Sequence, residues 1–296
     1  MSLAEAVGVP ARLSGRVGRT RAGRSKRGVI GVVIIGVVVM AAVFADQIAP
    51  YDPIRTSLAD RLRPPGFTPE AGPAHLFGTD QLGRDLLSRV IHGARISLLV
   101  GFVSVALAGA VGVGLGLTSG YYGGMWDQIT MRWVDVQLAF PSVVLAIAVL
   151  AIFGNSFINV IVVLAMASWV VYARLVRGLT LSIREKEYVE GARAIGCRDS
   201  RILARYILPN ALPAIVVIAT YQFAVMIIAE SGLSFLGLGV PPPAPTWGAG
   251  INAGRDYLAQ AWWVTTFPGL ALMITIMGAT FLGDWAREAL DPTVRV

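Results

Sequence analysis

Few residues in this chain have the types and spacing that catalysis requires. The two histidines, His75 and His92, are far apart and belong to no H-E-x-x-H pair, and no G-x-S-x-G elbow presents a nucleophilic serine. The sequence also has no G-x-x-x-x-G-K-[ST] loop, which would cradle the phosphates of a nucleotide. The single Cys197 excludes an intrachain disulfide. We therefore expect a protein that is not an enzyme, with no catalytic residue, no metal site and no cofactor.

The stretch best suited to bind a partner is amphipathic and lies between two apolar runs. It covers residues 187–210 and reads EYVEGARAIGCRDSRILARYILPN. Its charged side chains would be costly inside a bilayer, so we expect a loop that reaches a soluble partner. Apolar residues in its first part recur at helical spacing, namely Tyr188, Val189, Ala192 and Ile195.

Local signals divide this loop into two helices. Gly196 can end the first helix in a left-handed turn, and Asp199 or Ser200 can cap a second helix. Pro209 limits the continuation of that second helix into the next apolar run. A helix, a turn and a helix that are exposed yet partly apolar favour docking into a groove of a partner. An amphipathic hairpin that rests on lipid headgroups is the alternative.

The elements that must position this loop are membrane helices. With 55% hydrophobic and 15% charged residues, the chain is too apolar for an ordinary soluble domain. Six continuous apolar runs approach the length of about 20 residues that a helix needs to cross a bilayer. They cover residues 28–45, 96–117, 136–154, 156–173, 211–229 and 264–283. Continuous runs exclude a β-barrel, whose strands alternate apolar and polar residues, and predict an all-α polytopic membrane protein.

Charged residues set the expected orientation. Lys and Arg greatly outnumber acids in residues 1–27 and are also in excess around the loop 186–210, whereas the segments 46–94 and 230–262 have no such excess. The positive-inside rule therefore predicts a cytoplasmic N-terminal tail, a cytoplasmic loop and, with six spans, a cytoplasmic C-terminus. Because the net charge of +7 is concentrated in these segments, anionic lipid is a better partner for the tail than nucleic acid. A cleaved signal peptide over the first run is the alternative reading, although its 18 apolar residues exceed a usual signal core.

Further patterns concern the bundle. Gly112, Gly116 and Gly120 form a ridge without side chains that suits close helix packing. A short surface helix is expected to end near Gly93, before the second span. Three tryptophans suit a belt at the membrane interface, namely Trp247, Trp262 and Trp263. No ionisable residue falls inside the six runs, which argues against a proton- or ion-driven carrier.

The motif EGARAIG followed by ILP resembles the EAA loop of type I ABC importer permeases. That family pattern is EAA, three residues, Gly, nine residues and I-x-L-P. The positions that match it in register are Glu190, Ala192, Gly196, Leu208 and Pro209. Gly191 replaces the second family position and loosens the helix slightly, and Tyr206 replaces the expected Ile.

The resemblance extends over most of the chain. Residues 75–101, 231–251 and 281–295 are similar to the second permease subunit of dipeptide and oligopeptide importers, and residues 1–27 fall outside it. It implies the following organisation: a basic cytoplasmic tail (1–27), a first transmembrane helix (28–45), an extracellular Pro-rich segment (46–94), a five-helix core (95–284) with the EAA loop (186–210), and a cytoplasmic C-terminal tail (285–296). The implied fold is that of a six-helix type I ABC importer permease in the cell membrane.

The resemblance also implies partners and a role. The chain would form half of a pore with a homologous permease subunit, above two ABC ATPase subunits and below an extracellular substrate-binding protein. The EAA loop would couple the pore to an ATPase through Tyr188, Glu190, Gly191, Ala192, Gly196, Leu208 and Pro209. Peptides are the expected cargo, and nickel chelates, heme or other cargo on the same fold remain alternatives. A membrane scaffold or a membrane-bound enzyme are remote alternatives.

Overall fold

The computed structural model describes residues 21–69 and 73–290, with side chains from residue 27 onward. In this part of the chain regular structure is helical, apart from two isolated β-bridges. The helices are α1 (Arg21–Val43), α2 (Ala45–Ile48), α3 (Leu86–Tyr122), α4 (Gly124–Leu138), α5 (Ser142–Phe153), α6 (Phe157–Arg184), α7 (Glu187–Ala194), α8 (Asp199–Ile202), α9 (Leu208–Phe235), α10 (Trp247–Gly254) and α11 (Trp263–Leu290). Short 3-10 turns cover Leu58–Asp60 and Arg255–Tyr257, and a π-helical turn covers Leu203–Ile207.

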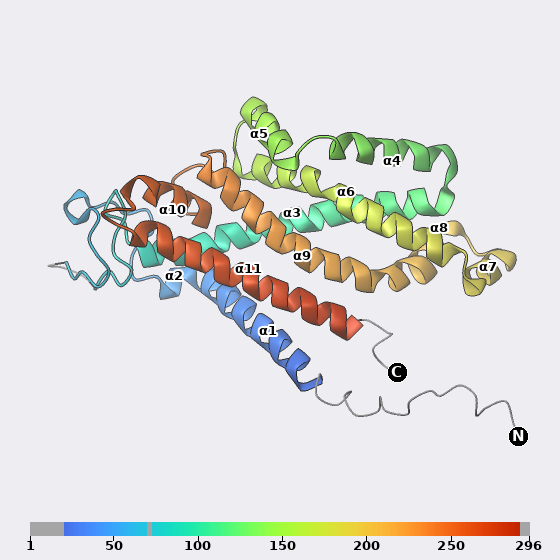
Figure 1. Ribbon diagram of the computed structural model, residues 1–296, viewed down its shortest axis with the longest axis horizontal. Helices are drawn as coiled ribbons and strands as arrows, with labels where there is room; N and C mark the ends of the chain where they lie inside the picture. Colours follow the sequence, from blue (N-terminus) through green and yellow to red (C-terminus); the bar gives the residue numbers. More distant parts are fainter. Residues whose placement is uncertain (1–20, 70–72, 291–296) are drawn as a thin grey trace, which may run out of the picture.

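Long helices run side by side and give the molecule two distinct ends (Figure 1). The loop with α7 and α8 lies at one end, which we call the loop end. The segment before α3 and helix α10 lie at the other, which we call the far end. Helix α1 begins toward the loop end, and α11 ends toward it. Most of the basic tail expected over 1–27 lies outside the described residues, as do 291–296 of the expected C-terminal tail; residues 285–290 belong to α11.

Four helices among the described residues are long and apolar enough to cross a membrane, and a bent pair makes a fifth. The four are α3, α6, α11 and the stretch from Asp199 to Phe235, which includes α9. The first expected span corresponds to α1, whose apolar part, Arg27–Val43, is shorter. The all-α membrane fold is therefore confirmed, whereas the count of six equal spans is supported only roughly.

The third expected span, 136–154, is not one helix. It is divided between α4 and α5, whose axes differ by 87° across a break of a few residues. Pro141 is the residue that precedes α5, and its extended backbone (ψ 125°) interrupts the helix. Because proline has no N–H and disfavours helical backbone at the residue before it, the break falls at this point.

The helix expected to end near Gly93 instead continues as α3. It begins at Leu86, where the Asp85 carboxylate caps it by accepting from the Ser88 N–H at 2.7 Å. Gly93 has a packing role, because a Cβ there would lie 3.1 Å from the ring of Trp247. Trp247 is buried and donates its indole N–H to the Val90 carbonyl at 3.0 Å, so it is not part of an interfacial belt.

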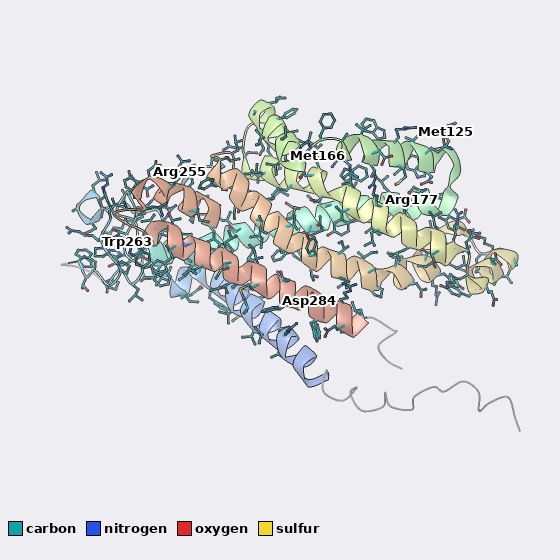
Figure 2. The ribbon with its side chains drawn as sticks, viewed as in Figure 1. Met125, Met166, Arg177, Arg255, Trp263 and Asp284 are labelled. Carbon is teal, nitrogen blue, oxygen red and sulfur yellow. The ribbon has the colours of Figure 1, made fainter. Side chains whose placement is uncertain are left out.

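Trp263, labelled in Figure 2, is also buried, and its indole N–H donates to the Thr79 carbonyl at 3.2 Å. Trp262 is 53% exposed and remains compatible with a belt. Two of the three expected belt residues are thus packing residues at the far end.

The glycine ridge on α3 packs against α6, as predicted. A Cβ on Gly112 would lie 2.3 Å from the Trp169 carbonyl oxygen, and a Cβ on Gly116 would lie 2.7 Å from that of Ala173. A Cβ on Gly120 would lie 2.8 Å from Thr180 Cβ. These distances leave no room for a side chain, so the ridge allows the two backbones to approach closely.

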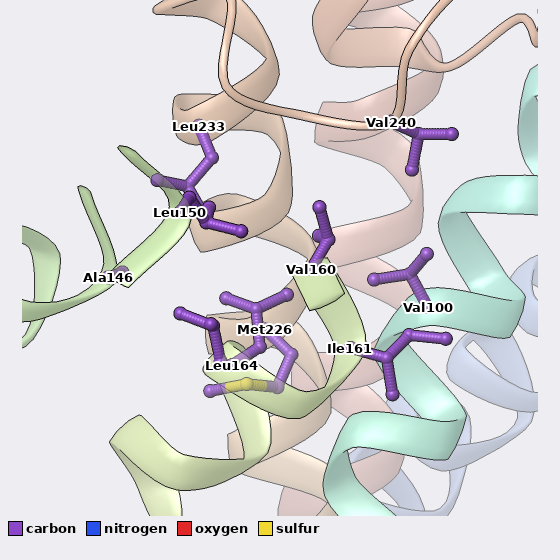
Figure 3. Close-up of a cluster of buried hydrophobic side chains, with 10 residues drawn as sticks. Val100, Ala146, Leu150, Val160, Ile161, Leu164, Met226, Leu233 and Val240 are labelled. Carbon is purple, nitrogen blue, oxygen red and sulfur yellow. The ribbon is translucent and has the colours of Figure 1, made fainter. Parts of the chain in front are cut away.

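A core of aliphatic side chains holds α5 onto the long helices (Figure 3). Leu150 of α5 lies in it with Leu164 of α6, Met226 of α9 and Val100 of α3, and each is at most 3% exposed. Val240, from the segment after α9, closes the cluster. The core therefore joins α5 to α3, α6 and α9.

The helix that contains the fifth apolar run extends beyond that run. Because α9 runs to Phe235, Glu230 lies inside that helix rather than in an outer segment, and it is fully buried. The apolar run ends at residue 229 by composition, whereas the helix continues to Phe235 and its residues Ser231, Leu233 and Ser234 are also buried.

The far-end segment before α3 is irregular but built around buried polar groups. The Asp85 carboxylate contacts His75 Nδ1 at 2.8 Å, and Asp80 accepts from Arg84 Nε at 2.7 Å. His75 also stacks on the ring of Tyr51, with centroids 4.5 Å apart. These contacts connect the described parts of the segment through buried polar and aromatic side chains, although little regular structure is present.

Candidate partner-docking site

The amphipathic loop 186–210 forms a small unit with its own apolar base. In α7 the side chains of Val189 and Ala192 point inward and are 0% and 5% exposed. They pack with Ile202 and Ile207 of the same loop and with Leu117 of α3. The loop is therefore anchored on the bundle and is more than a charged connection between two spans.

The other faces of α7 are exposed. At about 100° per residue, Gly191 and Ala194 lie opposite the buried Val189 and Ala192. Glu187 and Glu190 lie beside these small residues, and all four are exposed. Two larger apolar side chains form one flank, Tyr188 at 45% and Ile195 at 79% exposure. The apolar stripe seen in the sequence is thus divided into a buried half and an exposed half.

This outward surface suits binding to a protein. Small residues at its centre allow close approach of a partner backbone, and the exposed Tyr188 and Ile195 offer apolar area to bury. Within the described ranges no group of three His, Cys, Asp or Glu side chains could hold a metal ion. The features of this surface are therefore those of a site that recognises a protein partner.

Gly196 closes α7 in the left-handed turn that the sequence predicts. Its φ is +76°, the Cys197 N–H donates to the Ala192 carbonyl at 3.0 Å, and the Gly196 N–H donates to the Arg193 carbonyl at 2.9 Å. This pair of bonds is a Schellman motif, which satisfies carbonyls that a helix end would otherwise leave unpaired.

Alanine substitutions at the two glycines of this loop should act in opposite directions. Gly196→Ala forces a Cβ into a left-handed conformation at a cost of about 1 kcal/mol, so amide exchange in residues 187–196 should become about fivefold faster. Gly191→Ala meets open space in a regular helix and should slow exchange, because alanine is favoured by about 1 kcal/mol. Hydrogen–deuterium exchange measures both, and equal effects of the two variants would contradict the left-handed turn.

The second helix begins differently from the prediction. The N-cap of α8 is Arg198, whose side chain makes no capping hydrogen bond, while Asp199 and Ser200 are its first helical residues. The Asp199 carboxylate is engaged elsewhere, because it accepts from the Tyr121 hydroxyl at 2.7 Å. Its negative charge in the first turn still suits the helix dipole.

Pro209 does not stop the second helix. A π-helical turn at 203–207 leads directly into α9, with the Leu208 N–H donating to the Leu203 carbonyl five residues earlier. Pro209 occupies the first turn of α9, where its missing N–H costs least. At this turn the backbone hydrogen bonds span five residues instead of four, which lets the helix continue past Pro209. The second part of the loop and α9 therefore form one continuous helical path from Asp199 to Phe235.

Polar braces that the sequence patterns did not reveal fix the loop to α3. The Tyr121 ring lies under the Arg193 guanidinium, whose carbon is 4.9 Å from the ring centroid. Arg184, at the end of α6, donates to the Gly120 carbonyl at 2.8 Å. The sequence around Tyr121 and Gly120 does not predict these two contacts, because their partners, Arg193 and Arg184, are far away along the chain.

A second set of braces joins α4 to α6. Arg177, labelled in Figure 2, donates to both oxygens of Asp127 at 2.5 and 2.6 Å. Arg174 pairs with Asp135 at 2.6 Å in a more exposed setting. A paired charge is far less costly near the membrane than an isolated one, so these contacts allow α4 to lie along α6.

The seven predicted coupling residues lie in three places. Tyr188, Glu190 and Gly191 are exposed on α7. Ala192 faces the loop interior, and Gly196 forms the turn after α7. Leu208 and Pro209 lie at the start of α9 rather than on the exposed surface of α7. The structure thus brings three of them to a single outward surface.

Two family models match the chain. The family described as "Binding-protein-dependent transport system inner membrane component" matches residues 112–296. The description "N-terminal TM domain of oligopeptide transport permease C" matches residues 19–65. Together these ranges include α1 and the bundle from the middle of α3 onward.

Several curated proteins are similar over most of their length. The di/tripeptide transport system permease protein DppC of Pseudomonas aeruginosa (strain UCBPP-PA14) is 40% identical over 254 residues, covering 86% of this chain and 84% of that protein. The glutathione transport system permease protein GsiD of Escherichia coli O1:K1 / APEC is 43% identical over 258 residues, covering 86% and 83%. A putative peptide transport system permease protein of Brucella suis biovar 1 (strain 1330) is 42% identical, covering 87% and 84%.

Among solved structures, the inward-facing MetNI methionine ABC transporter has a similar chain. The TM-score is 0.57 at 21% sequence identity, covering 70% of this chain and 98% of that one. This similarity concerns the fold alone, and it agrees with the bundle described above.

Proposed function

The chain belongs to the family of binding-protein-dependent transport system inner membrane components, and on this premise we propose that it forms half of the pore of an ATP-driven importer of short peptides. It is a multi-pass permease subunit of the inner membrane that works with ATPase and binding-protein subunits. The family and the relatives are transport permeases rather than enzymes. ATP hydrolysis therefore belongs to separate subunits.

The observation that carries the proposal is the exposed surface of α7 on its buried base. In the proposed complex this surface lies in a groove of one ATPase, where Glu190 pairs with a basic or hydrogen-bonding residue. Ala192 supports the helix from inside, and Gly196 sets its end. A homologous permease presents a second such helix to a second ATPase. Closure of the ATPase pair draws both helices together and turns the pore from inward-facing to outward-facing.

The proposed substrate is a short peptide released by an external binding protein. Two relatives are named for di/tripeptide and glutathione transport, and a third for peptide transport. We place the binding protein at the far end of the bundle, because the segment before α3 and the segment around α10 both lie there (Figure 1).

Uptake by the reconstituted complex tests this function. The chain, its companion permease, both ATPases and the binding protein are placed in liposomes, and accumulation of a radiolabelled dipeptide, tripeptide or glutathione is measured with and without ATP. We expect ATP-dependent uptake of at least one of these peptides. Uptake of a nickel chelate or heme, with no peptide transported, would overturn the proposed cargo while leaving the importer mechanism intact.

Labelling of introduced cysteines tests the proposed orientation, in which the loop 186–210 and both termini are cytoplasmic. In a Cys197→Ser background, a cysteine at the exposed Ser200 should resist an impermeant thiol reagent in whole cells. A cysteine at the exposed Ala259, at the far end, should react. After lysis both should react, which controls for accessibility. Labelling of position 200 in intact cells would reverse the proposed topology.

A further inference from the structure

Glu230 is a fully buried acid that the proposed coupling contact does not use. It lies in the last two turns of α9, and its side chain is 0% exposed. Among the described residues no ion pair includes it. An isolated buried carboxyl group is costly unless hydrogen bonds compensate it, so its surroundings should explain why it is there.

Three hydroxyl groups, from α3 and α9, surround the carboxyl group. Ser234, one turn later in α9, donates to Oε1 at 2.7 Å. Ser97 of α3 and Ser231 of α9 donate to Oε2, each at 3.4 Å. A carboxylate has only acceptor sites, and these hydroxyls are arranged as donors toward it.

Two of these hydroxyls, those of Ser97 and Ser234, also accept hydrogen bonds from residues at the start of α10. The Trp247 N–H donates to Ser97 Oγ at 3.5 Å, and Ser97 in turn donates to Glu230. Thr246, which caps α10 by accepting from the Ala249 N–H at 3.1 Å, donates to Ser234 Oγ at 3.4 Å, and Ser234 donates to Glu230. Both chains of hydrogen bonds begin at an amide in the first turn of α10; the chain through Ser97 ends at Oε2 of Glu230, and the chain through Thr246 and Ser234 ends at Oε1.

This arrangement compensates both the unpaired N–H groups at the start of α10 and the burial of the Glu230 carboxyl group. The first N–H groups of a helix have no partner within the helix, and the helix dipole places partial positive charge there. The buried carboxyl group of Glu230 lies at the end of both hydroxyl chains that begin at those N–H groups. The packing is also tight, because a Cβ on Gly248 of α10 would lie 2.6 Å from Ser231 Cα.

The other end of α9 is continuous with the loop that carries α7. The helical path from Asp199 to Phe235 has no break, and Ile202 and Ile207 at its beginning are buried against the base of α7. We therefore expect a displacement of that loop to move α9, and the hydrogen bonds around Glu230 are one of the connections between α9 and α10.

We propose that Glu230 is a positioning residue that locks α10 to α9, so that movement of the loop 186–210 at one end of the bundle moves α10 at the other. The transport part of this inference rests on the proposed function, whereas the anchoring of α10 does not. Ser97 and Thr246 are the two relays in this lock. Ser231 contacts the same carboxyl group but receives no amide of α10, so it is outside the lock.

The chain offers a matched set of variants for the test. Ser97→Ala and Thr246→Val each remove one relay, Glu230→Ala removes both, and Ser231→Ala is the control. In the assembled complex, hydrogen–deuterium exchange of residues 247–254 should be at least tenfold faster in the first three and unchanged in the control. If Glu230→Ala does not assemble, Ser97→Ala and Thr246→Val decide the result. Unchanged exchange in α10 for both would overturn the anchoring.

Coupling is measured in the same preparations as the ratio of binding-protein-stimulated to basal ATP hydrolysis. We expect this ratio to fall at least fivefold when either relay is removed and to stay at the wild-type value in Ser231→Ala. Faster amide exchange in residues 247–254 with an unchanged ratio of stimulated to basal ATP hydrolysis would overturn the positioning role. Glu230 would then only stabilise the structure locally. If the wild-type complex transports no peptide, the proposed cargo fails, while the exchange experiment still tests the lock.

Discussion

Replacing Glu190 by arginine is expected to lower binding-protein-stimulated ATP hydrolysis and peptide uptake at least tenfold. Glu190 is exposed on α7 and forms no ion pair with another residue of the described ranges, so its proposed partner is on the ATPase. Reversing a charge in such a contact costs on the order of 2–5 kcal/mol, because it leaves the partner charge buried and faces it with a like charge. ATP hydrolysis and uptake in liposomes measure the effect.

The control for this experiment is Glu185→Arg. Glu185 is equally acidic and exposed, but it precedes α7 and its one ion pair, with Arg184, lies at the surface. Surface pairs contribute about 0–1 kcal/mol, so this variant should keep at least half of the activity. Co-purification of the ATPase distinguishes lost docking from lost catalysis. Normal coupling in Glu190→Arg would sink the assignment of α7 as the docking helix.

Replacing Gly112 by valine is expected to disrupt the contact between α3 and α6. The added Cβ would lie 2.3 Å from the Trp169 carbonyl oxygen and 2.6 Å from Tyr172 Cβ, distances at which the helices must separate. Overpacking of this kind costs about 3 kcal/mol, at the upper end of its usual range, because backbone rather than a flexible side chain is in the way. Thermal unfolding of the purified protein should shift down by more than about 5 °C.

Gly114 on the same helix is the matched control. A Cβ there meets nothing within 4 Å, so Gly114→Val changes the composition of α3 without touching α6. Its unfolding temperature should remain near that of the wild type. If both variants were equally destabilised, the loss would come from β-branching in the helix and not from the packing of the ridge.

Much of the fold is predictable from the sequence because its signals are local. Long apolar runs must form helices in a bilayer, since the backbone finds no other hydrogen-bond partners there. The spacing of Gly112, Gly116 and Gly120 indicates a packing face, and Gly196 indicates a left-handed turn, and both are present. In the docking loop the period of the apolar residues predicts α7 correctly.

Two of the misplaced boundaries result from contact between distant parts of the chain, and a third results from a local turn. Hydropathy ends one span at residue 229, yet α9 continues because α3 and α10 cover Glu230 and supply hydroxyl donors. Gly93 resembles a helix stop, yet it makes room for Trp247. Pro209 resembles a breaker, yet a π-helical turn accommodates it. For Glu230 and Gly93 the partner that decides the outcome is remote in sequence, whereas the turn that accommodates Pro209 directly precedes it.

By itself the sequence determines the class of this protein: a bundle of apolar helices with one exposed amphipathic loop. Apolar burial and backbone hydrogen bonding decide these features from neighbouring residues alone. Only the tertiary structure decides the 87° bend between α4 and α5, which half of the α7 stripe stays exposed, and the connection of Glu230 to α10. These depend on which surfaces meet, because a side chain is buried or left exposed by the element that packs on it.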